Sequence, residues 1–176
     1  RRIRIPNPRL LESERTFLDA DYLSGTSLTV VSNLGFALNN YAVIGETGEE
    51  KTEAQLVASI TGNTTVNLNA AYKFPHNKDL SLYRSEWNQV SIERKLHVSS
   101  IWGLLITTDI QWDKLETIYV DQTGDDTYDY RFRFFNSTTV YYSEYSPTVS
   151  GAGFAPQQVG DMIMHVREKI KDPNRS

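Results

Sequence analysis

The most regular pattern of hydrophobic and polar positions lies in residues 118–147. Large aromatic side chains occupy every second position there, with polar or charged residues between them; these rings are Tyr128, Tyr130, Phe132 and Phe134. Because successive side chains of a strand point to opposite faces of its sheet, this pattern predicts a half-buried antiparallel strand. A polar turn at residues 136–137 and a second strand with aromatic and β-branched residues follow it. We expect an opposing sheet to cover the rings.

Residues 14–87 show a weaker version of the same pattern. Alternating or continuous apolar positions occur near residues 28–30, 41–44, 54–60 and 66–68, and turns that contain glycine separate them. Short strands at a spacing of about ten residues are typical of a small β-barrel or β-sandwich. We therefore predict a first β-module over residues 14–87.

Residues 88–150 predict a second β-module. Val90 and Ile92 begin a strand, residues 104–110 and 117–120 form two more, and the aromatic hairpin completes the set. Trp102 and Trp112 are interpreted as residues of a core or a sheet face, since large rings are seldom left bare in water.

The first residues, 1–13, predict a basic extended arm. Four arginines and two prolines occur in its first nine positions. Proline lacks a backbone donor and disfavours helix in the residue before it, so the arm is extended. Two interpretations stay open, a solvated tail and an arm laid on a neighbouring subunit. For the second, Arg1, Arg2 and Arg4 are the candidate partner-binding residues, and removing the arm weakens assembly with little loss of stability.

The pattern changes to a helical period after a glycine-containing linker at residues 151–153. Apolar residues at helical spacing form one stripe, and a proline at position 173 ends the pattern. The stripe consists of Val159, Met162, Ile163, Val166 and Ile170. An amphipathic helix of about fifteen residues is marginal alone, so this stripe is a second candidate partner contact. Residues 151–176 are thus read as a linker and a helix.

Composition narrows the class of protein. The chain has 176 residues, 39% of them hydrophobic and 23% charged, which is ordinary for a globular protein. The net charge of −4 gives no support for direct nucleic-acid readout. The chain has no cysteine, which excludes disulfides and thiolate metal sites and fits assembly in a reducing cytoplasm. Absence of an apolar run of about 18 residues predicts no membrane span. The first residue is Arg, so we expect a processed or trimmed chain.

Few residues carry candidate chemistry. The histidines at 76, 97 and 165 lack zinc-ligand spacing, and residues 45–48 lack the Gly-Lys-Ser/Thr ending of a phosphate loop. Glutamates 49, 50 and 53 are interpreted as a solvated face rather than an acid–base pair. The loop at residues 121–126 gathers three carboxylates; turn-forming acids are the favoured reading, and a calcium site stays open. We predict no cofactor, no metal and no enzymatic activity.

Residues 127–136, together with the run Ser143, Glu144, Tyr145 and Ser146, resemble the last two strands of a fibronectin type III-like domain. The resemblance covers roughly residues 88–148 and implies a partial β-sandwich in which Tyr128 is the corner tyrosine, whose hydroxyl satisfies a nearby backbone group. The fold class predicted for the chain is therefore mainly β: a small β-barrel or sandwich module, a partial fibronectin type III-like sandwich and a C-terminal α-helix.

A second resemblance involves the whole of residues 1–150. The runs at 28–30, 44–46, 48–53 and 74–76, followed by the strand at 88–94, are similar to a β-module of tailed-phage structural proteins. Residues 159–173 resemble the opening helix of phage head-to-tail adaptor domains. The resemblance implies a virion structural protein of the connector or neck, assembled in the host cytoplasm. Its expected partners are copies of itself, in a ring, and portal, tail or other virion proteins.

Two alternatives belong to other classes. The chain can be read as a receptor- or carbohydrate-binding module of a phage tail or fibre, in which exposed rings such as Tyr141 stack on sugars. It can also be read as an accessory domain of a secreted polysaccharide enzyme. Binding to glycans favours the first of these, and hydrolysis of a polysaccharide favours the second.

Overall fold

The structure is a computed structural model that describes residues 1–150 and 161–163, and these residues are mainly β-strand. Two compact units divide the chain. The curled-sheet unit comprises Arg9–Asn88 and Trp112–Leu115, and the two-sheet unit comprises Arg1–Pro8, Gln89–Gln111 and the described residues from Glu116 onward. In the described residues no helix has the length and apolar character to cross a bilayer.

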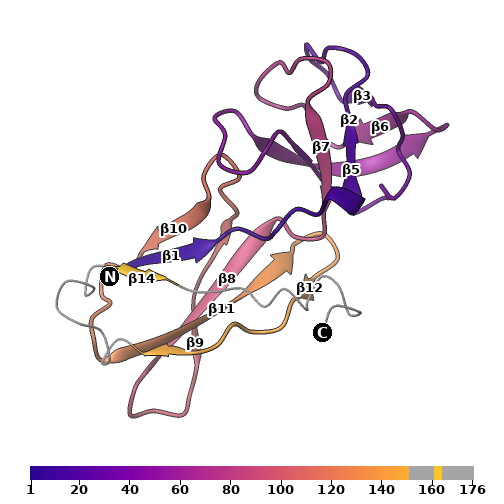
Figure 1. The fold of residues 1–176 in the computed structure, drawn as a ribbon. Coiled ribbons are helices and arrows are strands. Elements are labelled where there is room, and N and C mark those ends of the chain that lie inside the picture. Colours follow the sequence, from indigo (N-terminus) through magenta and orange to yellow (C-terminus); the bar gives the residue numbers. More distant parts are fainter. Residues whose placement is uncertain (151–160, 164–176) are drawn as a thin grey trace. The chain divides into compact units, whose positions relative to one another are not determined.

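The curled-sheet unit is built on one antiparallel sheet of six strands, in the order β2-β7-β4-β5-β6-β3 (Figure 1). Its two edge strands meet at a bridge between Leu18 and Val30, so the sheet curls into a half-barrel. A short 3₁₀ turn, Glu12–Glu14, precedes the first strand. The strands are β2 (Arg15–Phe17), β3 (Ser27–Thr29), β4 (Tyr41–Ile44), β5 (Glu53–Thr61), β6 (Thr65–Leu68) and β7 (Ser81–Ser85).

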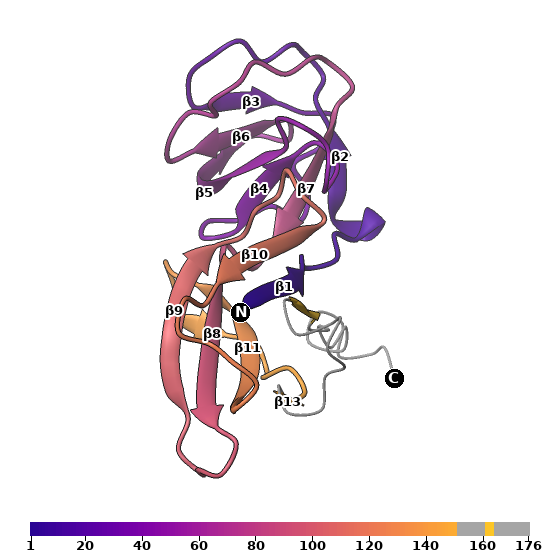
Figure 2. The same ribbon diagram turned by 90° about the vertical axis from the view of Figure 1, so that its left-hand side faces the viewer.

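Apolar side chains fill the inside of this curl. Leu18, Leu28, Val30, Ile44 and Leu82 are almost completely buried and belong to one core cluster. The prediction of a mainly β chain is confirmed here, and the sheet is a half-barrel where a small β-barrel or β-sandwich was predicted. Figure 2 shows the curl from the side.

One predicted face of this unit was wrong. The alternation in residues 54–60 predicts that Leu56 and Ile60 lie on the apolar face of β5, yet Val57 is the buried residue and Ile60 is exposed. The register with β6 shifts between Val57 and Ser59, so Ile60, opposite the buried Val66, returns to the same face as Val57, where it is 41% exposed near the end of β5.

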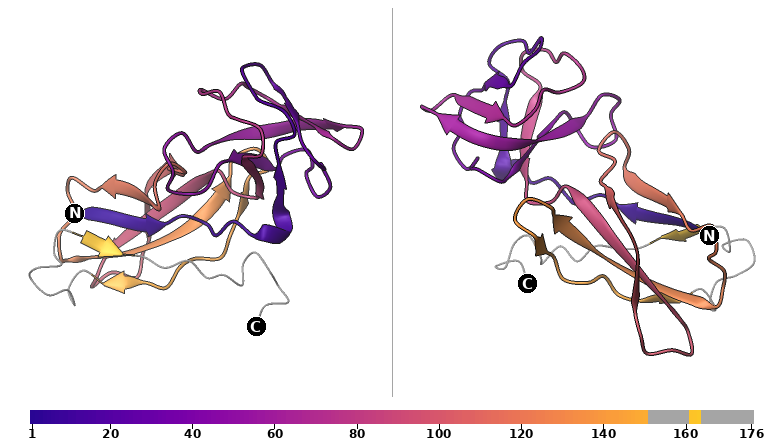
Figure 3. Two further views of the ribbon diagram at one scale, coloured as in Figure 1. Left: turned by 45° about the horizontal axis from the view of Figure 1, so that its top comes forward. Right: turned by 180° about the vertical axis from the view of Figure 1, so that it is seen from behind.

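The two-sheet unit contains a five-stranded and a three-stranded sheet. The larger has the order β12-β11-β8-β9, with β13 also paired to β11, and the smaller has the order β10-β1-β14 (Figures 1 and 3). Their bounds are β1 (Arg2–Pro6), β8 (Gln89–Leu96), β9 (Gly103–Asp109), β10 (Glu116–Val120), β11 (Tyr128–Asn136), β12 (Tyr141–Tyr142), β13 (Val149–Ser150) and β14 (Asp161–Ile163).

The aromatic strand that dominates the sequence pattern is β11. Tyr130, Phe132 and Phe134 are buried, and Phe132 pairs with Ile92 of β8 across the sheet. Ile3 and Ile5 of β1 are completely buried as well. The predicted inward face is thereby confirmed, and the strand prediction for residues 104–110 and 117–120 is confirmed by β9 and β10.

The segment after β12 follows β11 without forming a regular ladder. Ser143 N donates to Phe134 O at 2.9 Å, and Ser146 N donates to Phe132 O at 2.7 Å. A step of three residues along this segment therefore matches a step of two residues along β11. The serine hydroxyls supply the acceptors that the backbone cannot: Phe134 N donates to Ser143 Oγ and Phe132 N to Ser146 Oγ, at 2.8 and 2.9 Å. The predicted second strand is therefore shorter than expected, Tyr141–Tyr142, although the turn before it is present.

The two chain ends need correction. The basic arm is extended, as predicted, but Arg2–Pro6 is a strand of its own chain that pairs with β10 on one side. Residues 161–163, predicted to be helical, form β14, which pairs parallel with the other side of β1. Pairing with an open strand edge supplies hydrogen bonds that override a local helical pattern. The rest of the predicted helix lies outside the described residues.

Candidate functional site

A hairpin of the two-sheet unit exposes a run of apolar side chains. Strands β8 and β9 pair antiparallel as far as Arg94 and Gly103, and residues 97–102 connect them. The tip of this hairpin extends past β11 in Figure 2 and in the right-hand view of Figure 3. The exposed fractions are 46% for Leu96, 92% for Val98, 79% for Ile101 and 66% for Leu104. A cluster of exposed apolar side chains on one element is typical of a contact with another molecule.

Strand β9 is also an edge of the five-stranded sheet. It pairs with β8 on one side, and among the described residues no strand pairs with its other side. Its register with β8 shifts between Ile92 and Glu93, where Leu105 is the extra residue. A bulge of this kind twists an edge and limits uncontrolled pairing with other strands. A partner is therefore expected to contact the side chains at the hairpin tip rather than to pair with the backbone edge of β9.

Arginines and aromatic rings alternate on the outer face of the same sheet. The Arg131 guanidinium lies 4.3 Å from the ring centre of Trp102 and 3.7 Å from that of Tyr145. The Arg133 guanidinium lies 4.4 Å from Tyr145 and 3.7 Å from Tyr142. Cations held over aromatic faces at these distances are attracted by the ring quadrupole. We call this row the cation–π ladder.

The ladder leaves few ring faces for a ligand. Tyr142 stacks on Phe135 with ring centres 4.5 Å apart, while Arg133 covers the same tyrosine ring. Tyr145 lies between two guanidinium groups, and its hydroxyl donates to Glu93 at 2.8 Å. Sugar binding by stacking needs a free aromatic face, so this surface favours a structural role. Tyr141, at the edge, remains exposed.

A buried ion-pair network accounts for the acidic loop at residues 121–126. Asp121, with 3% of its side chain exposed, accepts from Arg94 Nη1 at 2.7 and 2.9 Å and from the Tyr130 hydroxyl at 2.8 Å. Its main-chain N and O both bond Arg1 at 2.7 Å. Gly124 is required beside it, because a Cβ there would meet the Tyr130 hydroxyl.

The same network shifts two pKa values. Burial opposes ionisation of Asp121, but hydrogen bonds from Tyr130 and Arg94 outweigh it, and the pKa of Asp121 is lowered. Burial and the hydrogen bond to Asp121 raise the pKa of Tyr130. Since its oxygens are already occupied, Asp121 has little left to offer a cation; within the described part of the chain no metal-binding group of three acidic, His or Cys residues occurs. Turn formation and pairing explain this loop.

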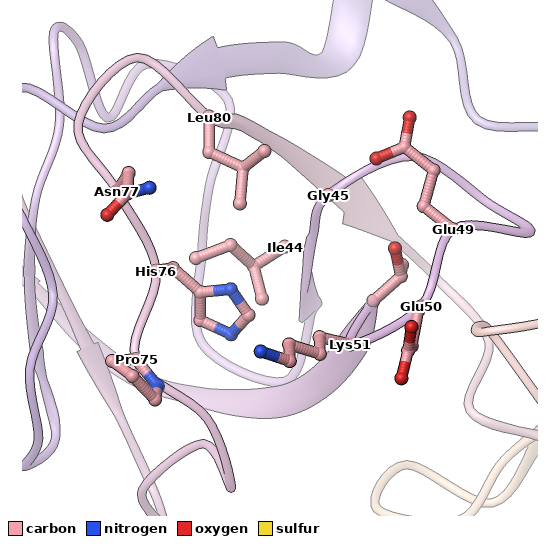
Figure 4. A pocket seen from close by; sticks show the side chains of 10 residues that line it. Ile44, Gly45, Glu49, Glu50, Lys51, Pro75, His76, Asn77 and Leu80 are labelled. Carbon is pink, nitrogen blue, oxygen red and sulfur yellow. The ribbon is translucent and has the colours of Figure 1, made fainter.

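The curled-sheet unit contains a pocket of about 230 Å³ (Figure 4). Its walls combine the turn that follows β4 with the loop that precedes β7, and it is lined by Ile44, Gly45, Glu49, Glu50, Lys51, Thr52, Pro75, His76, Asn77 and Leu80. His76 is buried, and its Nε2 lies 3.1 Å from Oε2 of Glu53. Glu53 also accepts from the backbone of Lys73 and Phe74, at 2.6 and 3.0 Å, which fixes the loop to β5.

Among the partner-binding residues predicted from the sequence, those in β1 and β14 lie side by side, with Arg4 opposite Ile163 in the parallel pair. Arg4 pairs with Glu116 of the neighbouring strand at 2.7 Å, and Arg1 contacts Asp121 through its backbone. Arg2 lies in β1 opposite Val120. In the second set, Met162 and Ile163 lie in β14; Val159, Val166 and Ile170 lie outside the described residues.

The sequence carries a signal for the hairpin that is separate from the alternation of apolar and polar positions. A connection between two strands is normally polar, yet residues 96–104 carry four large aliphatic side chains. The ladder had no comparable signal, because its arginines fit the polar face of an ordinary alternating strand. Comparison with known proteins adds no further evidence: the chain matches no family model, no curated protein and no solved structure at a significant level.

Proposed function

We propose that this chain is a non-enzymatic structural protein that works by assembly, and that the β8–β9 hairpin tip is its principal contact. The observation that carries the proposal is the exposure of Leu96, Val98, Ile101 and Leu104 on one short segment. Each such side chain contributes about 1.5–3 kcal/mol when it becomes fully buried. A partner that covers the tip therefore gains several kcal/mol, enough to hold a repeated interface.

The framework behind the hairpin supports a mechanical role. The buried ion pair between Arg94 and Asp121 anchors β8, and the ladder stiffens β11, which pairs with β8 along its length. The charged groups of this ion pair and of the ladder thus make their contacts within the unit. A rigid base under an apolar tip is what a protein needs to present a fixed surface to its neighbours.

The setting we propose is the head-to-tail connector or neck of a tailed-phage particle, with copies of this chain in a ring and with portal or tail proteins as partners. This part of the proposal rests on the sequence resemblance described above. Subunits that repeat around an axis use heterologous contacts, in which one surface meets a different surface of the next copy. The hairpin tip supplies one side of such a contact.

A paired substitution tests the proposal. The variant with Val98→Asp and Ile101→Asp places charge on two exposed positions, so its fold should be unchanged while assembly is lost. The control is Leu23→Asp, at a side chain that is also exposed but lies in the other unit. Sedimentation velocity over a range of concentrations should show association for the parent chain and the control, and a monomer for the paired variant.

A parent chain that stays monomeric at every concentration and also binds no portal or tail protein contradicts the proposal. Binding of that monomer to a glycan array would favour the receptor- or carbohydrate-binding alternative. Assembly that survives in the paired variant would leave the structural role standing and remove the hairpin from it.

A further inference from the structure

A second run of exposed apolar side chains lies in the curled-sheet unit, in the loop between β3 and β4. Leu34 is 90% exposed and Leu38 is 61% exposed, and Val31 at the start of the loop is exposed as well. Leucines with this exposure contribute little to the core of their own unit. Three large apolar side chains within eight positions mark a surface that another molecule can cover.

Two consecutive turns present the leucines. Residues 33–36 form the first turn and residues 37–40 the second; in each, the N–H of the fourth residue donates to the carbonyl of the first at 3.1 Å. The third residue of each turn has a left-handed backbone, with φ of 91° at Gly35 and 72° at Asn39. A type II turn has this arrangement and favours Gly or Asn at that position. The second residue of each turn is a leucine, and we call residues 33–40 the leucine double turn.

The leucine double turn is fixed to its unit at both ends and in the middle. The side-chain amide of Asn33 donates to two carbonyls at the β5–β6 connection, at 3.0 Å each. Phe36, which lies between the two leucines in the chain, is buried in the core cluster. At the other end, Val57 N of β5 donates to Asn40 O at 2.8 Å. A surface that is already ordered loses little conformational entropy when a partner binds to it.

The leucine double turn and the hairpin tip have the same charge character. Residues 22–45 contain no Asp, Glu, Lys or Arg, in a chain in which 23% of the residues are charged. Residues 96–108 contain none either, and Nδ1 of His97 lies 3.1 Å from Asp129 of its own unit. A charged group that met either surface would lose its water without gaining a counter-charge. Each surface therefore suits an uncharged apolar partner, and each has the properties that the other requires.

We propose that the leucine double turn of one copy receives the β8–β9 hairpin tip of the next copy. This inference rests on the assembly role proposed above, and it names the surface on the other side of that contact. Copies that repeat around an axis need two different surfaces that meet each other. A tip that met the tip of another copy would instead close a pair and stop growth, and the leucine double turn would stay in water.

Complementation between two variants tests this pairing. The tip variant carries Val98→Asp with Ile101→Asp, and the turn variant carries Leu34→Asp with Leu38→Asp, all at exposed positions. Each variant keeps one intact surface. We expect neither to associate alone, whereas an equimolar mixture should form pairs of one tip variant and one turn variant that grow no further. Sedimentation velocity with one variant labelled measures this, and the control Leu23→Asp, which precedes β3, should associate like the parent chain.

A disulfide between copies gives a second readout that does not depend on loss of association. The chain has no cysteine, so a single Cys at tip position 98 or 101, or at turn position 34 or 38, introduces the only thiol. Under mild oxidation, at least one mixture of a tip thiol with a turn thiol should yield mainly the mixed disulfide, because the bond needs Cα atoms within about 7 Å. Leu23→Cys mixed with the same tip thiols is the control and should stay at background.

The outcomes separate this inference from the assembly role. A turn variant that associates like the parent chain overturns the inference and leaves the hairpin contact standing. So does a mixture of tip and turn variants that stays monomeric and gives no mixed disulfide, or a disulfide that forms preferentially between two tips. A parent chain that stays monomeric at every concentration removes self-assembly itself, and this inference with it.

Discussion

The Arg133 guanidinium is held between two aromatic rings of the sheet. These rings cover part of the charged group and so reduce its contact with solvent. Its guanidinium lies 3.7 Å from the centre of Tyr142 and 4.4 Å from that of Tyr145. Partly desolvated cation–π contacts contribute about 0.5–2 kcal/mol each. The outer face of β11 consequently stabilises the unit alongside its buried face.

Substitutions on the two faces of β11 should reflect this. Arg133→Ala should lower the free energy of unfolding by about 1–3 kcal/mol through two lost cation–π contacts, and Arg133→Lys by less, since the charge remains. Phe132→Ala, which deletes a buried ring, should cost about 3–5 kcal/mol. Urea unfolding curves measure all three. An Arg133→Ala cost within about 0.5 kcal/mol, as for an ordinary surface position, would show that the ladder adds nothing.

Asp121 gives the two-sheet unit a defined acid response. Its pKa is lowered in the folded state, so the stability that it contributes is complete above the unfolded pKa of about 3.9. That contribution is lost as pH falls through the lower folded value. Asp121→Asn should therefore cost about 1.5–3 kcal/mol at neutral pH, the range for hydrogen bonds to a charged group, and less as pH drops below about 4.

Unfolding curves of parent and variant at several pH values test this response, with Asp113→Asn, at an exposed site, as the control. A difference between parent and Asp121→Asn that stays constant down to the acid limit would mean that the carboxylate charge is not what stabilises the loop.

At the scale of elements, β1 links the chain's beginning to residues more than a hundred positions away. It is the central strand of the three-stranded sheet, with Ile3 and Ile5 buried and Arg4 paired with Glu116. The alternation of Arg and Ile in residues 2–5 was visible in the sequence, but two nearby prolines and the positive charge favoured a free arm. Only the distant partner β10 distinguishes a strand from an arm, and long-range pairing leaves no local signal.

Removal of residues 1–8 should therefore destabilise the two-sheet unit instead of merely weakening assembly. Two buried isoleucines contribute about 2–5 kcal/mol each by comparison with truncation to alanine. Hydrogen exchange should accelerate in β10, which would lose its β1 partner, while β4 and β5 serve as internal controls. Unchanged exchange in β10 would restore the interpretation of these residues as a dispensable arm.

The same distinction between local and distant information explains what the sequence could predict. The inward rings of β11 and the strands β3 to β6 follow from alternation and glycine turns within a few residues. Strand β7, which carries Leu82 and Tyr83 in the core, has polar or charged neighbours that obscured it. The pocket joins residues near 45–52 with residues near 75–80, and the pairing of Glu53 with His76 that holds it could not be inferred from spacing alone.

At the scale of the whole molecule, the two units present different surface features. The curled-sheet unit holds a small pocket, and the two-sheet unit holds a stiff sheet with an exposed apolar tip.

The most direct measurement of the assembly proposal is hydrogen exchange on the full chain at low and at high concentration. We expect slower exchange at residues 96–104 under conditions in which the chain associates, and no slowing there in the Val98→Asp, Ile101→Asp variant. Association of the parent chain with exchange at residues 96–104 unchanged would contradict it, because the hairpin tip would then lie outside the contact.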